Sequence, residues 1–227
     1  MTAQVMSIAK REQELSYYLD KQPYPTELDG IHLIIAKNVF PSDFGITRSF
    51  FGHFMLQQAP AAMGLDMGCG SGYFACLLKK IGCQTVIGVD FNKDAVACAT
   101  KNITLNPSLV PINILHSDLF NAVPQTIFDI IVFNFNYYPS NGDFGLNADG
   151  GREILERFFT QVGAYSNAET RIYIPISEFV GIEHDPKIIC QQFGFTYEVA
   201  ATTSNETGNH CIYKIMKRPL VNAKNSE

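Results

Sequence analysis

Glycines at alternate positions follow an apolar run and could form a cradle for a small molecule. Gly68, Gly70 and Gly72 come after Asp66, and a helical pattern begins directly behind them. Alternate glycines let the backbone turn sharply after a strand and let a ligand approach without meeting a Cβ. A helix also leaves free N–H groups in its first turn. The stretch therefore predicts a strand, a loop and a helix that hold a ligand against their backbone.

A carboxylate ends the next predicted strand. Asp90 lies 22 residues after Gly68, and from that position it can accept hydrogen bonds from both hydroxyls of a ribose. The alternative is a cap on the following helix, because Asn92 and Asp94 stand close by. The ribose role is the interpretation that the spacing favours.

A dinucleotide site is the alternative for the glycine stretch. Its fingerprint is G-x-G-x-x-G, in which the third glycine allows close helix–strand packing. Tyr73 occupies that third position, where an aromatic ring would block such packing. The spacing D-x-G-x-G-x-G over residues 66–72 instead resembles the first motif of class I S-adenosylmethionine (SAM) methyltransferases. The resemblance implies SAM as the cofactor and S-adenosylhomocysteine (SAH) as its product.

A second stretch resembles the fourth motif of enzymes that methylate amino and amide nitrogens. Those families carry F-D-x-I-V-x-N-P-P-Y-x-P, and they include release-factor and ribosomal-protein glutamine methyltransferases as well as adenine-N6 and guanine-N2 enzymes. Residues 128–139 read F-D-I-I-V-F-N-F-N-Y-Y-P, so Phe135 and Asn136 replace the central prolines. The loop regains two N–H donors and loses two fixed φ angles. This departure leaves open a different substrate, or a domain whose catalysis has decayed.

The residue types of this motif suit methyl transfer to a planar nitrogen, whose lone pair is delocalised and poorly nucleophilic. The Asn134 side-chain oxygen and the Phe135 backbone carbonyl can each accept one N–H of an NH₂ group. Two fixed acceptors would turn the nitrogen lone pair toward the methyl group and stabilise positive charge that develops on nitrogen. Tyr137 would supply a flat apolar wall for the acceptor. The alternative is a polar turn flanked by core aromatics.

The resemblance covers roughly residues 30 to 216 and implies further cofactor contacts. Asp118 would accept the adenine amine with Leu119 against the ring, although an aspartate that only forms a turn is the alternative. Residues 39–41 with Thr47 resemble a segment that covers the cofactor, and residues 146–153 resemble the L-x-x-D-G-G segment of the glutamine enzymes. The implied cofactor-binding residues are Thr47, Asp66, Gly68, Cys69, Gly70, Gly72, Asp90, Phe91, Asp118, Leu119 and Asn134.

Strand and helix patterns alternate from residue 63 onward. Strands are expected at 63–67, 84–90, 111–116, 127–134, 170–177, 195–201 and 208–216, and helices at 72–82, 93–105, 151–164 and 184–193. Strands spaced by such helices favour a parallel sheet covered on both faces. A hairpin loop over residues 204–208 requires one antiparallel strand at the end. The predicted fold is α/β, a Rossmann-like seven-stranded sheet, for which the resemblance implies the order 3-2-1-4-5-7-6.

The chain is predicted to divide into an N-terminal extension, one main domain and a tail. Residues 1–60 would form a helix at 3–20, a linker that starts at Pro23 and Pro25, and a β-rich stretch at 31–40, all lying over the cofactor site. Residues 61–217 would form the SAM-binding domain. Residues 218–227 would form a flexible tail.

Composition indicates which substrates and partners the chain could have. The 227 residues carry a net charge of −5, which favours a protein substrate over nucleic acid. A base methyltransferase on RNA or DNA and a non-catalytic SAM-binding module are the alternatives. Six cysteines without a C-x-x-C pair and five histidines without ligand spacing predict no metal. The chain shows no apolar leader and no apolar run of membrane-spanning length, so we expect a cytoplasmic protein without a membrane partner.

Overall fold

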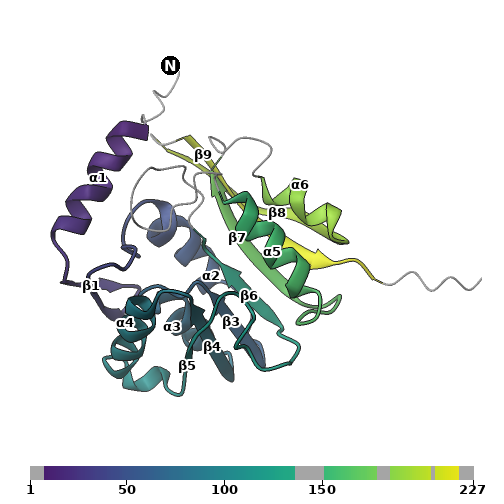
Figure 1. Cartoon of the computed structure of the whole chain (residues 1–227), viewed down its shortest axis with the longest axis horizontal. Helices are drawn as coiled ribbons and strands as arrows, with labels where there is room; N and C mark the ends of the chain where they lie inside the picture. The colour runs from purple at the N-terminus through teal and green to yellow at the C-terminus, as the bar shows by residue number, and fades with distance from the viewer. Residues whose placement is uncertain (1–7, 136–150, 178–184, 206–207, 220–227) are drawn as a thin grey trace, which may run out of the picture.

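The computed structural model describes residues 8–135, 151–177, 185–205 and 208–219. A seven-stranded sheet forms its centre (Figure 1), in the order β5-β4-β3-β6-β7-β9-β8. Its strands are β3 (Met63–Met67), β4 (Thr85–Asp90), β5 (Asn113–His116), β6 (Ile130–Phe133), β7 (Arg171–Ser177), β8 (Phe195–Asn205) and β9 (Gly208–Lys217). The first five are parallel, and β9 pairs antiparallel with β7 and β8. The predicted fold class and strand order are confirmed.

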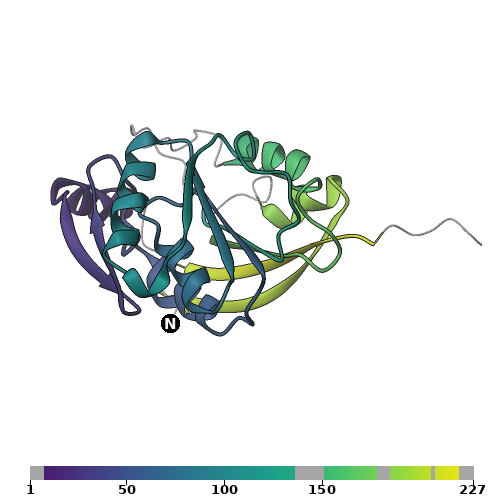
Figure 2. The same ribbon diagram turned by 90° about the horizontal axis from the view of Figure 1, so that it is seen from below.

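Helices cover both faces of the sheet (Figure 2): α3 (Tyr73–Lys80), α4 (Lys93–Thr104), α5 (Arg152–Val162) and α6 (Pro186–Gln192), with a 3₁₀ turn η2 (Pro107–Leu109). The side chains of β6 alternate between two apolar clusters. Ile131 and Phe133 join the cluster that contains Phe158 of α5. Ile130 and Val132 join the cluster that contains α3. Because both faces are covered, the strand is apolar throughout instead of alternating with polar residues.

The N-terminal segment forms α1 (Ile8–Asp20), the hairpin strands β1 (Tyr24–Leu28) and β2 (Ile31–Ile35), the π-helix η1 (Thr47–Gly52) and α2 (His53–Leu56). The predicted linker after Pro23 is wrong, because Pro25 lies within β1, which pairs antiparallel with β2. A proline is tolerated in a strand that lies at an edge. Figure 1 shows α1 at one side of the molecule, beyond this hairpin.

Two buried asparagines of the α4 region attach the hairpin to the main domain. The Asn102 side-chain amide accepts from the Ile34 N–H at 2.9 Å and donates to the Ile34 carbonyl at 3.0 Å. Asn106 makes the same pair of bonds with His32, at 3.0 and 2.8 Å. Each amide thus replaces a neighbouring strand along the free edge of β2. Asn102 also donates to the carbonyl of Ser71, so the hairpin, α4 and the glycine stretch are connected.

Leu33 of β2 and Phe51 of η1 are buried in the same apolar cluster as α3. Residues of the N-terminal segment therefore share a core with the main domain, and the division between residues 60 and 61 stays a prediction. No helix of the described part is long and apolar enough to cross a membrane.

Candidate active site

A cavity of about 1200 Å³ opens at the carboxyl ends of the parallel strands. Ligands of open α/β sheets bind outside these ends, near the point where the strand order reverses. The structure brings nine of the predicted residues to this cavity: Gly68, Cys69, Gly70, Asp90, Phe91, Asp118, Leu119, Asn134 and Phe135. Residues from four separate segments of the chain therefore meet at one site.

The other four predicted residues either do not line the cavity or are not fully within the part of the chain that the structure describes. Asp66 and Gly72 are not among the residues that line the cavity. Thr47 is the first residue of η1, but its side chain lies outside the described part, and so does the whole of Tyr137.

The glycine loop has an open face and a fixed backbone. Gly68 and Gly70 have φ angles of +72° and +53°, in the left-handed region that favours glycine. A Cβ on Gly70 would meet no protein atom within 4 Å. The N–H groups of Gly68 and Cys69 both donate to the Val89 carbonyl at 2.8 Å, which fixes the loop on β4. An open loop of this kind fits a ligand that approaches the backbone closely.

Gly72 serves the packing of the fold. Its φ is +85°, and a Cβ there would approach the Ala99 Cβ to 3.1 Å. The start of α3 can therefore lie close to α4. Tyr73 is buried, and its hydroxyl donates to Asp29 Oδ2 at 2.5 Å. This close packing lies at Gly72 and joins two helices, so the expected effect of the Tyr73 ring on helix–strand packing stays a prediction.

Asp90 is 8% exposed at the end of β4, and backbone N–H groups hold both of its carboxylate oxygens. Oδ2 accepts from Gly70 and Oδ1 from Asn92, each at 2.9 Å. Burial raises the pKa of this carboxyl above its ordinary value. Asp90 does not cap α4, because Asn92 is the cap and accepts from the Asp94 N–H. Each Asp90 oxygen retains a second acceptor position, which fits a ribose diol.

Asp66 lies beneath the glycine loop. Its Oδ2 accepts from the Ala75 N–H at 2.8 Å, which attaches the first turn of α3 to β3. Burial raises the pKa of Asp66 to about 8, and the nearby Asp90 charge adds to this effect. The geometry makes Asp66 a positioning residue for the loop.

The turn after β5 has a left-handed residue that is not glycine. Leu119 has a φ of +48°, and both Leu119 and Asp118 line the cavity. The Ser117 hydroxyl donates to the Leu119 carbonyl at 2.7 Å and accepts from the Ala122 N–H at 2.9 Å. A strained backbone that its surroundings fix in this way is typical of a ligand site.

Asn134 and Phe135 continue from β6 into the cavity wall. The Phe135 side chain is only 8% exposed, and its ring centre lies 5.1 Å from that of Phe133. The ring therefore belongs to the core, and the backbone carbonyl is the group that could serve an acceptor substrate. Asn136, which replaces a proline of the resembled motif, lies outside the described residues, as does Pro139.

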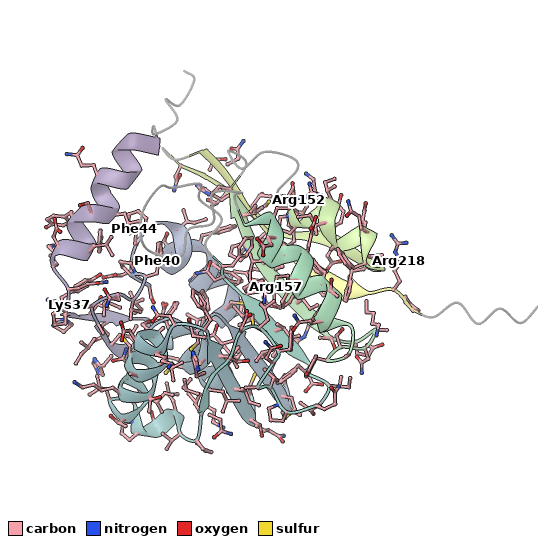
Figure 3. All side chains as sticks on the ribbon, in the orientation of Figure 1. Lys37, Phe40, Phe44, Arg152, Arg157 and Arg218 are labelled. Atoms are coloured by element: carbon pink, nitrogen blue, oxygen red, sulfur yellow. The ribbon has the colours of Figure 1, made fainter. Side chains whose placement is uncertain are left out.

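The predicted covering segment, residues 39–41, lines the cavity together with Ser42 and Phe44. The Ser42 hydroxyl lies 2.6 Å from that of Ser71, next to the glycine loop. The rings of Phe40 and Phe44 meet edge to face with centres 5.9 Å apart. Figure 3 shows these two phenylalanines between α1 and the centre of the molecule.

Sequence reasoning missed the contribution of α5 and β7. Glu153, Ile154 and Arg157 of α5 line the cavity, together with Pro175 of β7. Positions 153 and 157 share one face of the helix predicted over 151–164, which was the available signal. The partner of Arg157 is Asp118, 39 positions away, and no sequence pattern indicates that pair. The described part contains no group of histidine, cysteine or acidic residues that could hold a metal ion.

Comparison with known proteins identifies the family. Residues 43–205 match the methyltransferase small domain family. A relative in Methanocaldococcus jannaschii, named as a candidate protein N5-glutamine methyltransferase, is 34% identical over 146 residues, which make up 60% of this chain and 72% of that protein. Ribosomal protein L11 methyltransferase of Thermosipho africanus is 44% identical over 70 residues, 31% of this chain and 26% of that protein.

Among solved structures, the 16S rRNA N2 G1207 methyltransferase of Thermus thermophilus, in complex with AdoMet and guanosine, has a TM-score of 0.62. It is 19% identical, and the likeness covers 86% of this chain and 50% of that chain, so it concerns the fold alone. The family match begins at residue 43, just after the covering segment, and extends through the glycine loop to β8. The chain belongs to the methyltransferase small domain family and is a SAM-dependent methyltransferase.

Proposed function

We propose that this methyltransferase acts on the side-chain amide nitrogen of a glutamine-like residue in a protein. The observation that carries the proposal is the position of Asn134. It directly follows β6 and lines the same cavity as Gly70 and Asp90. An amide oxygen beside a nucleoside cradle suits an acceptor that must be oriented rather than deprotonated.

Different residues of the chain would bind the cofactor and orient the substrate. When bound, SAM supplies a methyl group carried on a positively charged sulfur. Asp90 would accept from the ribose hydroxyls and Asp118 from the adenine amine. The Asn134 side-chain oxygen and the Phe135 carbonyl would each accept one N–H of the substrate amide. Their fixed dipoles stabilise the positive charge that develops on nitrogen, whose surplus proton then leaves to water.

Apolar groups on the cavity wall favour a neutral acceptor. Phe40, Phe44, Ile154 and Pro175 line it together with the polar residues of the site. A planar amide enters such surroundings at a lower desolvation cost than a charged amine does. This supports a carboxamide over a lysine as the methyl acceptor.

The charged residues of the cavity lining support a protein over a nucleic acid as the methyl acceptor. The charged residues that line the cavity are four acids and two bases, namely Asp90, Asp94, Asp118 and Glu153 against Lys93 and Arg157. The stretches 136–150 and 178–184, which follow Phe135 and β7 in sequence, contain four acidic residues and no lysine or arginine. Contacts with phosphates require the opposite sign. The M. jannaschii relative, named as a candidate protein N5-glutamine methyltransferase, supports the same acceptor class.

A labelling experiment tests the acceptor class. The protein is incubated with methyl-labelled SAM and cell lysate, and the label is then followed through nuclease and protease treatment. We expect label that resists nuclease, is lost with protease, and is found by mass spectrometry on a glutamine side chain. Label that disappears with nuclease would overturn the proposal in favour of a base methyltransferase. SAM binding without any labelled acceptor would make the chain a non-catalytic module.

A further inference from the structure

The ion pair between Arg157 and Asp118 joins two parts of the cavity wall. Arg157 Nη2 lies 2.5 Å from Asp118 Oδ2, and the two side chains are 40% and 48% exposed. Arg157 belongs to α5, where Figure 3 labels it, while Asp118 follows β5. Between described residues, no other ion pair has both of its partners in the cavity lining.

The pair engages one Asp118 oxygen only. Oδ2 accepts from Arg157, and no described residue donates to Oδ1. The main chain at this point is already fixed, because Leu119 has a φ of +48° and the Ser117 hydroxyl holds its carbonyl. The freedom that remains is rotation of the carboxylate, and Arg157 restricts it. Oδ1 is left with its lone pairs available to a donor inside the cavity.

We propose that Arg157 is a positioning residue for the cofactor's purine, and that it holds Asp118 so that the site selects a 6-amino purine over a 6-oxo purine. The inference rests on the proposed placement of SAM in this cavity. A carboxylate is an acceptor only, so it pairs with an amino group and repels a carbonyl oxygen at the same position. A mobile carboxylate could turn away into water. A carboxylate that an arginine holds cannot turn away. The carboxylate and the 6-oxo oxygen, both acceptors, are then left unpaired, which disfavours the 6-oxo ligand.

Arginine suits this role better than lysine would. Its guanidinium is always charged, is planar, and presents its donors in a fixed fork, whereas an ammonium group is a rotatable point charge. Arg157 also lies one turn after Glu153 on the same helix, and both residues line the cavity. The pair therefore connects the proposed purine end of the site to the helix that borders the rest of it.

Calorimetric titration of the full chain with SAH and with its 6-oxo analogue, S-inosylhomocysteine, tests the inference. We expect the wild type to prefer SAH by about ten-fold or more, as expected for a site that pairs a polar group of its ligand. Arg157→Met should lower this preference to about two-fold while weakening SAH binding only about five-fold, because half-exposed ion pairs contribute modestly. Arg157→Lys should recover part of the preference. Asp118→Asn should remove it, because an amide can turn and donate to the 6-oxo group.

Two further variants distinguish the role of Arg157 from the proposed placement of the cofactor. Glu156→Gln breaks the neighbouring Arg152–Glu156 pair on α5, a 2.8 Å contact of similar exposure, and should leave the preference unchanged. Asp90→Ala should weaken both ligands equally. If Asp90→Ala binds both ligands like the wild type, the proposed placement of the cofactor fails. If Asp90→Ala weakens them but Arg157→Met keeps the wild-type preference, or binds SAH more tightly, the role of Arg157 alone is overturned.

Discussion

The Asp90 carboxylate accepts a hydrogen bond from the Gly70 N–H at 2.9 Å, and this bond joins the glycine loop to the end of the neighbouring strand. The proposed ribose ligand and the proposed backbone cradle are thus held together before any ligand arrives. Preorganisation of this kind lowers the ordering cost of binding. The glycines of the loop therefore divide into those that face the ligand and those that serve the fold.

Gly70→Ala should act mainly on SAH affinity, and Gly72→Ala mainly on stability. At Gly70 the new Cβ meets no protein atom within 4 Å, so we expect a loss of about 1–2 kcal/mol from the left-handed backbone and a large loss of SAH affinity. At Gly72 the Cβ would lie 3.1 Å from the Ala99 Cβ, so the loss of stability should be greater. Urea unfolding and calorimetric titration measure the two effects. Equal losses of stability in both variants would contradict this division.

Asp66→Asn should change how stability depends on pH. Burial raises the pKa of Asp66 to about 8, whereas an aspartate in the unfolded chain titrates near 4. Between these values the native state binds a proton that the unfolded state lacks, so the wild type loses stability as pH rises, by up to about 1.4 kcal/mol per pH unit. An asparagine does not titrate and can still accept from the Ala75 N–H.

Urea unfolding of wild type and Asp66→Asn at pH 5.5, 7 and 8.5 measures this difference. We expect the variant to gain on the wild type at each step upward in pH. A difference in unfolding free energy that stays constant over the range would show that Asp66 is ionised throughout.

Asn102→Ala should detach the N-terminal hairpin. The change leaves the Ile34 N–H and the carbonyls of Ile34 and Ser71 without the amide that bonds them, and we expect a loss of about 2–4 kcal/mol. Thr100→Ala on the exposed face of α4 is the matched control and should cost less than about 1 kcal/mol. Amide hydrogen exchange in β2 should rise in the first variant only. Unchanged exchange there would show that apolar packing alone holds the hairpin.

The sheet was predictable because its signals are local. Residues 63–67 were predicted as a strand and form β3. An apolar run that ends at a glycine turn indicates a buried strand from the sequence alone. The order of the strands followed from the resemblance of two motifs, at residues 66–72 and 128–139. The carboxyl ends of parallel strands then brought Asp90, Asp118 and Asn134 to one cavity.

What remained hidden depends on partners distant in sequence. Pro25 was predicted to start a linker, yet its segment is a strand because β2 pairs with it, and the side chains of Asn102 and Asn106 bond the other edge of β2. The ion pair of Arg157 with Asp118 gave no signal because the two residues belong to different βα units. No local pattern indicates the partner of Tyr73 either, since its hydroxyl donates to Asp29 of the hairpin turn, 44 positions away. The roles predicted for Tyr137 and the Thr47 side chain stay predictions.

The central claim is that Asn134 orients the acceptor amide and leaves the cofactor site unaffected. The most direct test compares wild type with Asn134→Ala. For each, we would measure SAH affinity and the rate of methyl transfer to the protein substrate that the labelling experiment identifies. We expect transfer to fall by about 100-fold or more, as when a fixed dipole is removed from a transition state. SAH affinity should stay within about two-fold. Transfer that persists near the wild-type rate, or that falls only in proportion to SAH binding, would contradict the role assigned to Asn134.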